Sequence, residues 1–120
     1  MTFRKDFEIG SSSAFFKVFD DAMFEEYKKN GVKLMEISHN KTYFEKELDY
    51  LNRADEIFAR AAGYGVKINS IHLPFYPNLD LSSLNGELRE NTVAAFKKYL
   101  KAAASSGIGI AVVHPSIEPI

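Results

Sequence analysis

The chain has 120 residues, the length of one domain, and its 46% hydrophobic and 26% charged residues are typical of a soluble globular protein. Fifteen basic and sixteen acidic residues give a formal charge of -1, which provides no basic surface for DNA, RNA or anionic lipid and favours small-molecule or protein partners. Cysteine is absent, the polar start MTFRKDFE differs from a signal peptide, and no segment approaches the roughly 20 apolar residues of a membrane span, so we expect a cytoplasmic protein.

The first third of the chain predicts a strand, a helix and a second strand. The strand covers residues 6–10 and is followed by turn residues at 10–13, whereas the apolar run AFFKVF (14–19) fits a strand or a helix start equally well. Residues 20–30 begin with acids, end with lysines and precede Gly31, which is typical of a helix. Residues 32–38 (VKLMEIS) predict the second strand.

The rest of the chain repeats this alternation of helices and strands. Thr42 and Glu45 form a capping box for a helix that ends at Gly63, and residues 66–74 predict the third strand. A proline-containing loop at 75–86 leads to a helix at 87–106, and residues 108–113 predict the fourth strand. The last helix has an apolar stripe formed by Leu88, Val93, Phe96, Leu100 and Ala103. The predicted order is βαβαβαβ.

Two of the three histidines follow apolar strands, at His72 and His114. Strands that alternate with helices are expected to pair in parallel, which places all their carboxyl ends at one edge of the sheet. Ligand sites of α/β proteins lie at that edge. The sequence therefore predicts that His72 and His114 face one pocket.

The alternation of side chains along a strand predicts which residues share a face. The face with the histidines would also carry a carboxylate and two hydroxyls, while Met35 and Ile37 would face the helices. The predicted inner positions are Leu34, Glu36 and Ser38 in the second strand, Ile68, Ser70 and His72 in the third, and Ile110, Val112 and His114 in the fourth.

Each of these polar residues also has a purely structural interpretation. A single histidine on an apolar strand is more often a hydrogen-bonded core residue than a ligand, and Glu36 could be a structural acid paired with a cation. His39 has the other parity and is expected in a solvated loop. The occurrence of two histidines at equivalent strand ends favours a site.

The segments LMEIS (34–38), SIHLPF (70–75) and VVHPSIEP (112–119) resemble the xylose isomerase-like (β/α)8 barrels, the superfamily of sugar-phosphate isomerases and epimerases that also contains endonuclease IV. The resemblance spans nearly the whole chain but only about half of such a barrel, whose usual size is roughly 250 residues. It implies one partial barrel domain over residues 1–120: an α/β fold that forms the N-terminal half, about four βα units with parallel strands, of a TIM-type barrel.

The resemblance also implies roles for three residues. Glu36, His72 and His114 would contact substrate, and His72 and His114 match histidines that bind metal in the endonuclease branch. The complete protein would use a divalent metal, one of Mn, Mg, Zn or Co. In the isomerase branches the metal-binding and proton-transferring carboxylates come from strands five to eight, so no catalytic residue is identified within this chain.

Three functions remain open at this point. The leading hypothesis is the N-terminal half of a metal-dependent sugar or sugar-phosphate isomerase or epimerase, with a small sugar as partner. The alternatives are an endonuclease IV-like metal-dependent phosphodiesterase, which the near-neutral charge disfavours, and a non-catalytic half-barrel that serves binding or assembly. We expect the chain to associate with another copy or with a C-terminal half, and to be inactive alone.

Overall fold

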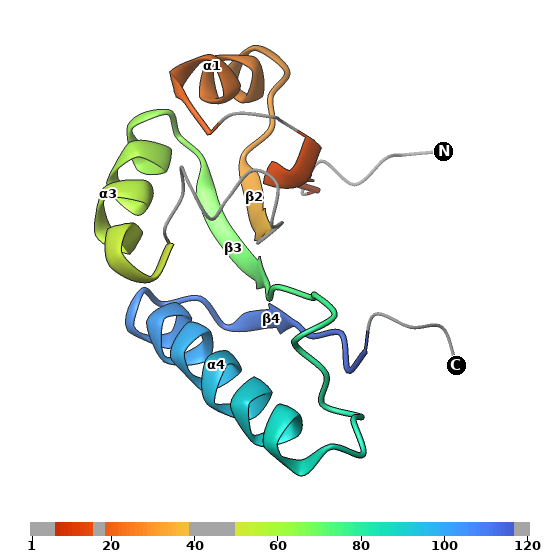
Figure 1. Cartoon of the computed structure of the whole chain (residues 1–120). Helices are drawn as coiled ribbons and strands as arrows, with labels where there is room; N and C mark the ends of the chain where they lie inside the picture. Colours follow the sequence, from red (N-terminus) through yellow and green to blue (C-terminus); the bar gives the residue numbers. More distant parts are fainter. Residues whose placement is uncertain (1–6, 16–18, 39–49, 117–120) are drawn as a thin grey trace.

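Four parallel strands form a single sheet in the order β1-β2-β3-β4 (Figure 1). The computed structural model describes residues 7–15, 19–38 and 50–116. The strands are β1 (Gly10–Ser12), β2 (Leu34–Ser38), β3 (Lys67–His72) and β4 (Ile110–Val112). The predicted α/β fold with parallel strands is confirmed.

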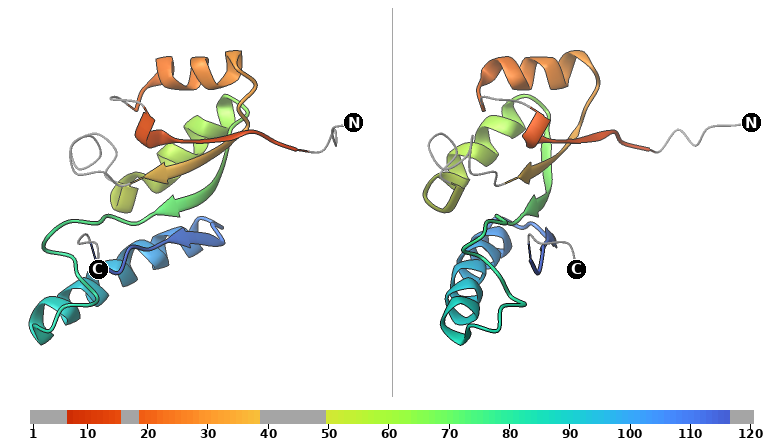
Figure 2. Two further views of the ribbon diagram at one scale, coloured as in Figure 1. Left: turned by 90° about the vertical axis from the view of Figure 1, so that its right-hand side faces the viewer. Right: turned by 45° about the vertical axis from the view of Figure 1, so that its right-hand side comes forward.

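The helices α1 (Asp21–Lys29), α3 (Tyr50–Gly63) and α4 (Gly86–Ser105) lie on one side of this sheet (Figure 2). The Asp20 carboxylate accepts a hydrogen bond from the Met23 N–H at 3.0 Å, and Asn85 caps α4 in the same way through the Leu88 N–H. The helix start expected at Thr42 and Glu45 lies outside the described residues. Within the described part of the chain, no helix is long and apolar enough to cross a membrane.

The hydrophobic core lies between the sheet and the helices. Met35 and Ile37 of β2 are fully buried, as predicted for helix-facing positions, and the Phe24 ring of α1 stacks on Tyr64 with centroids 5.3 Å apart. The buried hydrophobic residues are Met23, Phe24, Tyr27, Met35, Ile37, Ile57, Ala61, Val66, Ile68, Ile71, Leu73, Phe96, Ala103 and Ile108. The other face of the sheet, which we call the inner face, is left uncovered by these helices.

The first strand differs from its prediction. Residues 7–9 are irregular, and the strand is formed by Gly10–Ser12, which the sequence assigned to a turn. A Cβ on Gly10 would lie 3.2 Å from the Cβ of Leu34, so glycine permits the close approach of β1 to β2. The buried Ser13 hydroxyl then accepts a hydrogen bond from the Ser38 N–H at 3.0 Å. Backbone pairing rather than apolar side chains therefore defines β1.

The buried face of α4 also differs from the predicted stripe. Val93 and Leu100 are 37% and 41% exposed, whereas Thr92, Phe96 and Ala103 are buried. The Thr92 hydroxyl donates to the Leu88 carbonyl at 2.8 Å and accepts from the Asp80 N–H at 2.9 Å. A polar residue occupies this face because it holds the loop before α4 against the helix.

A β-bulge in β3 changes the predicted alternation. Met35 pairs with Ile68 and Glu36 pairs with Ser70, so Asn69 is an extra residue opposite β2. Ile68 therefore lies on the helix side, in the core, and its predicted inner position is wrong. Beyond the bulge, Ser70 and His72 follow the predicted parity, because they pair with Glu36 and Ser38.

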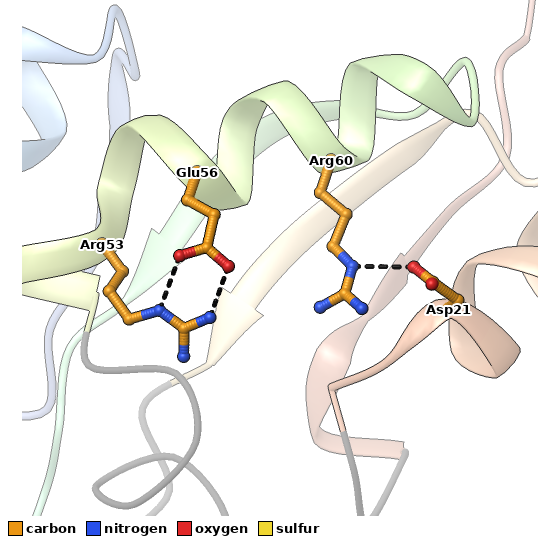
Figure 3. Close-up of polar contacts among 4 residues, drawn as sticks. All are labelled: Asp21, Arg53, Glu56 and Arg60. Carbon is orange, nitrogen blue, oxygen red and sulfur yellow. Dashed lines mark hydrogen bonds and ion pairs between the residues drawn. The ribbon is translucent and has the colours of Figure 1, made fainter.

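One ion pair joins two helices on the outer surface. The Arg60 Nε of α3 lies 2.8 Å from the Asp21 Oδ1 of α1, whereas Arg53 and Glu56 pair within α3 (Figure 3). The hydrogen bond from Arg60 lowers the pKa of the Asp21 carboxyl below its usual value. Because Asp21 is mostly exposed, solvent screening limits this contribution.

Candidate functional site

The imidazoles of His72 and His114 lie side by side at the carboxyl ends of β3 and β4. Their Nε2 atoms are 3.0 Å apart and their ring centroids 4.9 Å apart. The pairing of His72 with Val112 produces this contact, because His114 follows Val112 by two residues and leaves the sheet at the same edge. Both histidines are half-buried, so the pair remains accessible at the carboxyl edge of the sheet.

The backbone beside His72 selects its tautomer. The His72 Nδ1 lies 3.0 Å from the Leu73 carbonyl oxygen, which can only accept a hydrogen bond, so Nδ1 carries the proton. In this tautomer the Nε2 of His72 has a lone pair that accepts from the Nε2–H of His114. A ligand that inserts between the two rings would therefore meet one acceptor nitrogen, the Nε2 of His72, and one donor nitrogen, the Nε2 of His114.

Glu36 lies on the same inner face as His72. It pairs with Ser70, so it lies two residues before the level of His72 along the parallel strands. Its carboxylate Oε2 accepts a hydrogen bond from the Ser70 hydroxyl at 3.4 Å. Glu36 and Ser70 line a hollow of about 250 Å³, and Ser12 and Asn69 line it as well. Sequence reasoning missed both, because Ser12 was assigned to a turn and Asn69 occupies the bulge.

Phe75 is a further residue beside the histidines that the sequence did not single out. Its ring stacks on His114 with centroids 4.6 Å apart and an interplanar angle of 25°, and lies 5.4 Å from the His72 ring. The residue is still 42% exposed. In the sequence, Phe75 is the last residue of the segment SIHLPF (70–75), three residues after His72 and at the start of the proline-containing loop.

The histidine pair would fit two positions of a metal site once the His114 proton moves from Nε2 to Nδ1, which leaves a lone pair on both Nε2 atoms. Two nitrogens bound to one tetrahedral Zn²⁺ at about 2.0–2.1 Å lie about 3.3 Å apart, close to the 3.0 Å found here. The hydrogen bond from His72 Nδ1 to a carbonyl is the usual support of a metal-binding imidazole. The described residues contain no group of three or more His, Cys, Asp or Glu that could hold a metal ion.

Comparison with solved structures defines the fold. A structure of D-psicose 3-epimerase with D-tagatose from Clostridium cellulolyticum superimposes with a TM-score of 0.66 at 18% identity, covering 88% of this chain and 36% of the epimerase chain. The TTHB071 protein from Thermus thermophilus, soaked with ZnCl2, gives a TM-score of 0.59 at 23% identity, covering 92% and 40% of the two chains. The chain therefore shares the fold of the matched part of these two structures, a half-barrel of parallel strands with helices on its outer side.

The half-barrel spans less than half the length of either solved chain. No protein-family model matches its sequence, and no curated protein is significantly similar to it. The resemblance noted in the sequence is thus confirmed at the level of the fold. In a barrel the inner face of the half-barrel lines the interior, and the edge that carries His72 and His114 corresponds to the face where TIM barrels bind substrate.

Proposed function

We propose that this half-barrel is the N-terminal half of a metal-dependent sugar or sugar-phosphate isomerase or epimerase. The observation that carries the proposal is the contact between the Nε2 atoms of His72 and His114 at the carboxyl ends of β3 and β4. A structural neighbour that is a sugar epimerase with D-tagatose supports the choice of a sugar as ligand. The formal charge of -1 favours this choice over a nucleic-acid substrate.

The three inner-face residues have distinct roles in this proposal. His72 and His114 bind sugar oxygens or contribute two nitrogen ligands to a divalent metal, which when bound polarises the oxygens of the substrate. A sugar hydroxyl both donates and accepts hydrogen bonds, so it can satisfy the acceptor Nε2 of His72 and the donor Nε2 of His114. Glu36 accepts hydrogen bonds from the deeper end of the ligand.

Isomerisation and epimerisation of a ketose both require removal of a proton next to the carbonyl. Glu36 is bonded to Ser70 and lies deeper than the histidines, so we assign it to binding rather than to proton transfer. The carboxylate that removes the proton is expected on the strands that complete the barrel. The half-barrel would thus supply binding and orientation.

Ligand binding by the full chain tests this proposal. We expect the imidazole NMR signals of His72 and His114 to shift on titration with D-tagatose and, separately, with Mn²⁺, Mg²⁺, Zn²⁺ or Co²⁺. The variants His72→Ala and His114→Ala should each lose at least about tenfold in affinity for the metal that binds most tightly. Leu84→Ala is the matched control, because Leu84 is 100% exposed in the loop after β3. Affinities that are unchanged in both histidine variants would contradict the proposal.

A further inference from the structure

The most informative side chain outside the histidine pair is Phe75, because it is exposed on a rigid backbone. Leu73 and Pro74, the two residues before it, are buried, and the Leu73 N–H donates to the Val112 carbonyl at 2.9 Å. Pro74 has a fixed φ and restricts Leu73 to extended conformations. The position of the Phe75 Cα is therefore set by the end of β3.

The ring of Phe75 extends the surface of the histidine pair. One part of the ring covers His114 at a centroid distance of 4.6 Å, and the 42% exposure of the residue leaves another part in contact with solvent. The accessible surface therefore combines an apolar ring with two imidazole nitrogens at its border. Ligand pockets commonly combine apolar and aromatic walls with a few such polar groups.

The charges of the surrounding segments limit the ligand class. Residues 69–80 and 110–116, which build the described part of this surface, contain neither lysine nor arginine. A phosphate group is usually bound by cationic side chains or by charge-assisted hydrogen bonds. A neutral sugar instead presents C–H groups, which suit an apolar ring, and hydroxyls, which suit the imidazole nitrogens.

We infer that Phe75 is a specificity-determining residue whose exposed ring packs against the C–H face of a neutral, unphosphorylated sugar while His72 and His114 bind its hydroxyls. This inference rests on the proposed function and names its substrate class. Phe75 binds and orients the sugar and takes no part in proton transfer.

The affinity of the full chain for D-tagatose and D-tagatose 6-phosphate, measured by calorimetry, tests the inference. Phe75→Ala and Phe75→Leu should each weaken D-tagatose binding about fivefold to tenfold, because both remove the flat ring. Phe75→Tyr should stay within about twofold, and Zn²⁺ affinity should change little in all three variants. Leu84→Ala is the control, since it truncates a fully exposed apolar residue of the same loop.

The outcomes separate this inference from the proposed function. If the wild type binds D-tagatose and Phe75→Leu binds it equally well, the role of Phe75 is overturned while the proposed function stands. If the wild type binds only D-tagatose 6-phosphate, the assignment of an unphosphorylated sugar is overturned while the proposed function stands. A wild type that binds neither sugar overturns the proposed function and the inference with it. If Phe75→Ala does not fold, the difference between Phe75→Leu and Phe75→Tyr decides.

Discussion

His72 and His114 are 42 residues apart in sequence, yet their Nε2 atoms lie 3.0 Å apart. The contact follows from the parallel pairing of β3 with β4, which sets His72 beside Val112 and brings His114 past the same edge. Each Nε2 atom therefore has the other as a hydrogen-bond partner. This reciprocal contact makes the pair testable as one unit.

We predict that the losses of metal affinity caused by substituting His72 and His114 are not additive. If both nitrogens bind one Zn²⁺, His72→Ala and His114→Ala should each weaken Zn²⁺ binding by about tenfold or more, and the double variant should be only slightly worse than either single variant. Calorimetric titration of the three variants measures this coupling. Additive losses in the double variant would instead indicate two independent weak sites.

The β-bulge predicts different stability effects for two isoleucines that simple alternation places on one face. Ile68 is 5% exposed, so Ile68→Ala should lower the free energy of unfolding by about 2–5 kcal/mol. Ile110 is 53% exposed, so Ile110→Ala should change it by about 0.5 kcal/mol or less. Urea unfolding of both variants provides the comparison. Equal losses would mean that Ile68 lies on the inner face and that the bulge is absent.

The ion pair between α1 and α3 predicts a defined pH dependence. The Arg60 hydrogen bond lowers the pKa of Asp21 below the usual 3.8, so folding favours the charged carboxylate. The contribution of the Asp21 carboxylate to the free energy of unfolding is complete above pH 3.8. It is lost as the pH falls through the lower pKa that Asp21 has in the folded state. Urea unfolding of the wild type and Asp21→Asn should therefore differ near neutral pH and converge in strong acid.

An NMR titration checks the cause of that pH dependence. In Arg60→Gln the pKa of the Asp21 carboxyl should rise toward its usual value, because its largest lowering influence is removed. High salt should have a similar but weaker effect, since the pair is solvent-exposed. A pKa of Asp21 that is unchanged in Arg60→Gln would assign the shift to another group.

The open sheet predicts association and inactivity of the isolated chain. No strand in the described part of the chain pairs with the outer edge of β1 or β4, and Ile110, Val112 and Val113 are exposed around β4. Size-exclusion chromatography with light scattering should show a mass that increases with protein concentration, and Ile110→Lys should reduce this association. A ketose isomerisation assay with divalent metal should show no turnover. A folded monomer with activity would refute both expectations.

Much of the fold could be predicted because strand and helix signals agreed along the chain. The charge gradient of residues 20–30 and the helix-ending Gly107 correspond to α1 and to the end of α4. The histidine contact was also predictable, since parallel strands end at one edge. The strand β1 was not, because Gly10, Ser11 and Ser12 have turn-like side chains and are held by backbone pairing.

The remaining differences arise where tertiary contacts override local patterns. Val93 and Leu100 fit an apolar stripe, yet Thr92 is the buried residue because its hydroxyl binds two backbone groups. Phe75 belongs to the segment SIHLPF but was assigned no role, and its position beside His114 depends on contacts between β3 and β4. Neither kind of contact leaves a periodic signal in the sequence.

Because of the β-bulge, Asn69 lines the hollow without pairing with a residue of β2. Asn69 has no partner in β2, since Met35 pairs with Ile68 and Glu36 with Ser70, yet it lines the hollow beside Glu36. Deleting Asn69 would leave an ordinary ladder with Ile68 still in the core and His72 still at the strand end. A substitution at Asn69 would therefore change the wall of this hollow while the pairing of Met35 with Ile68 and of Glu36 with Ser70 is retained.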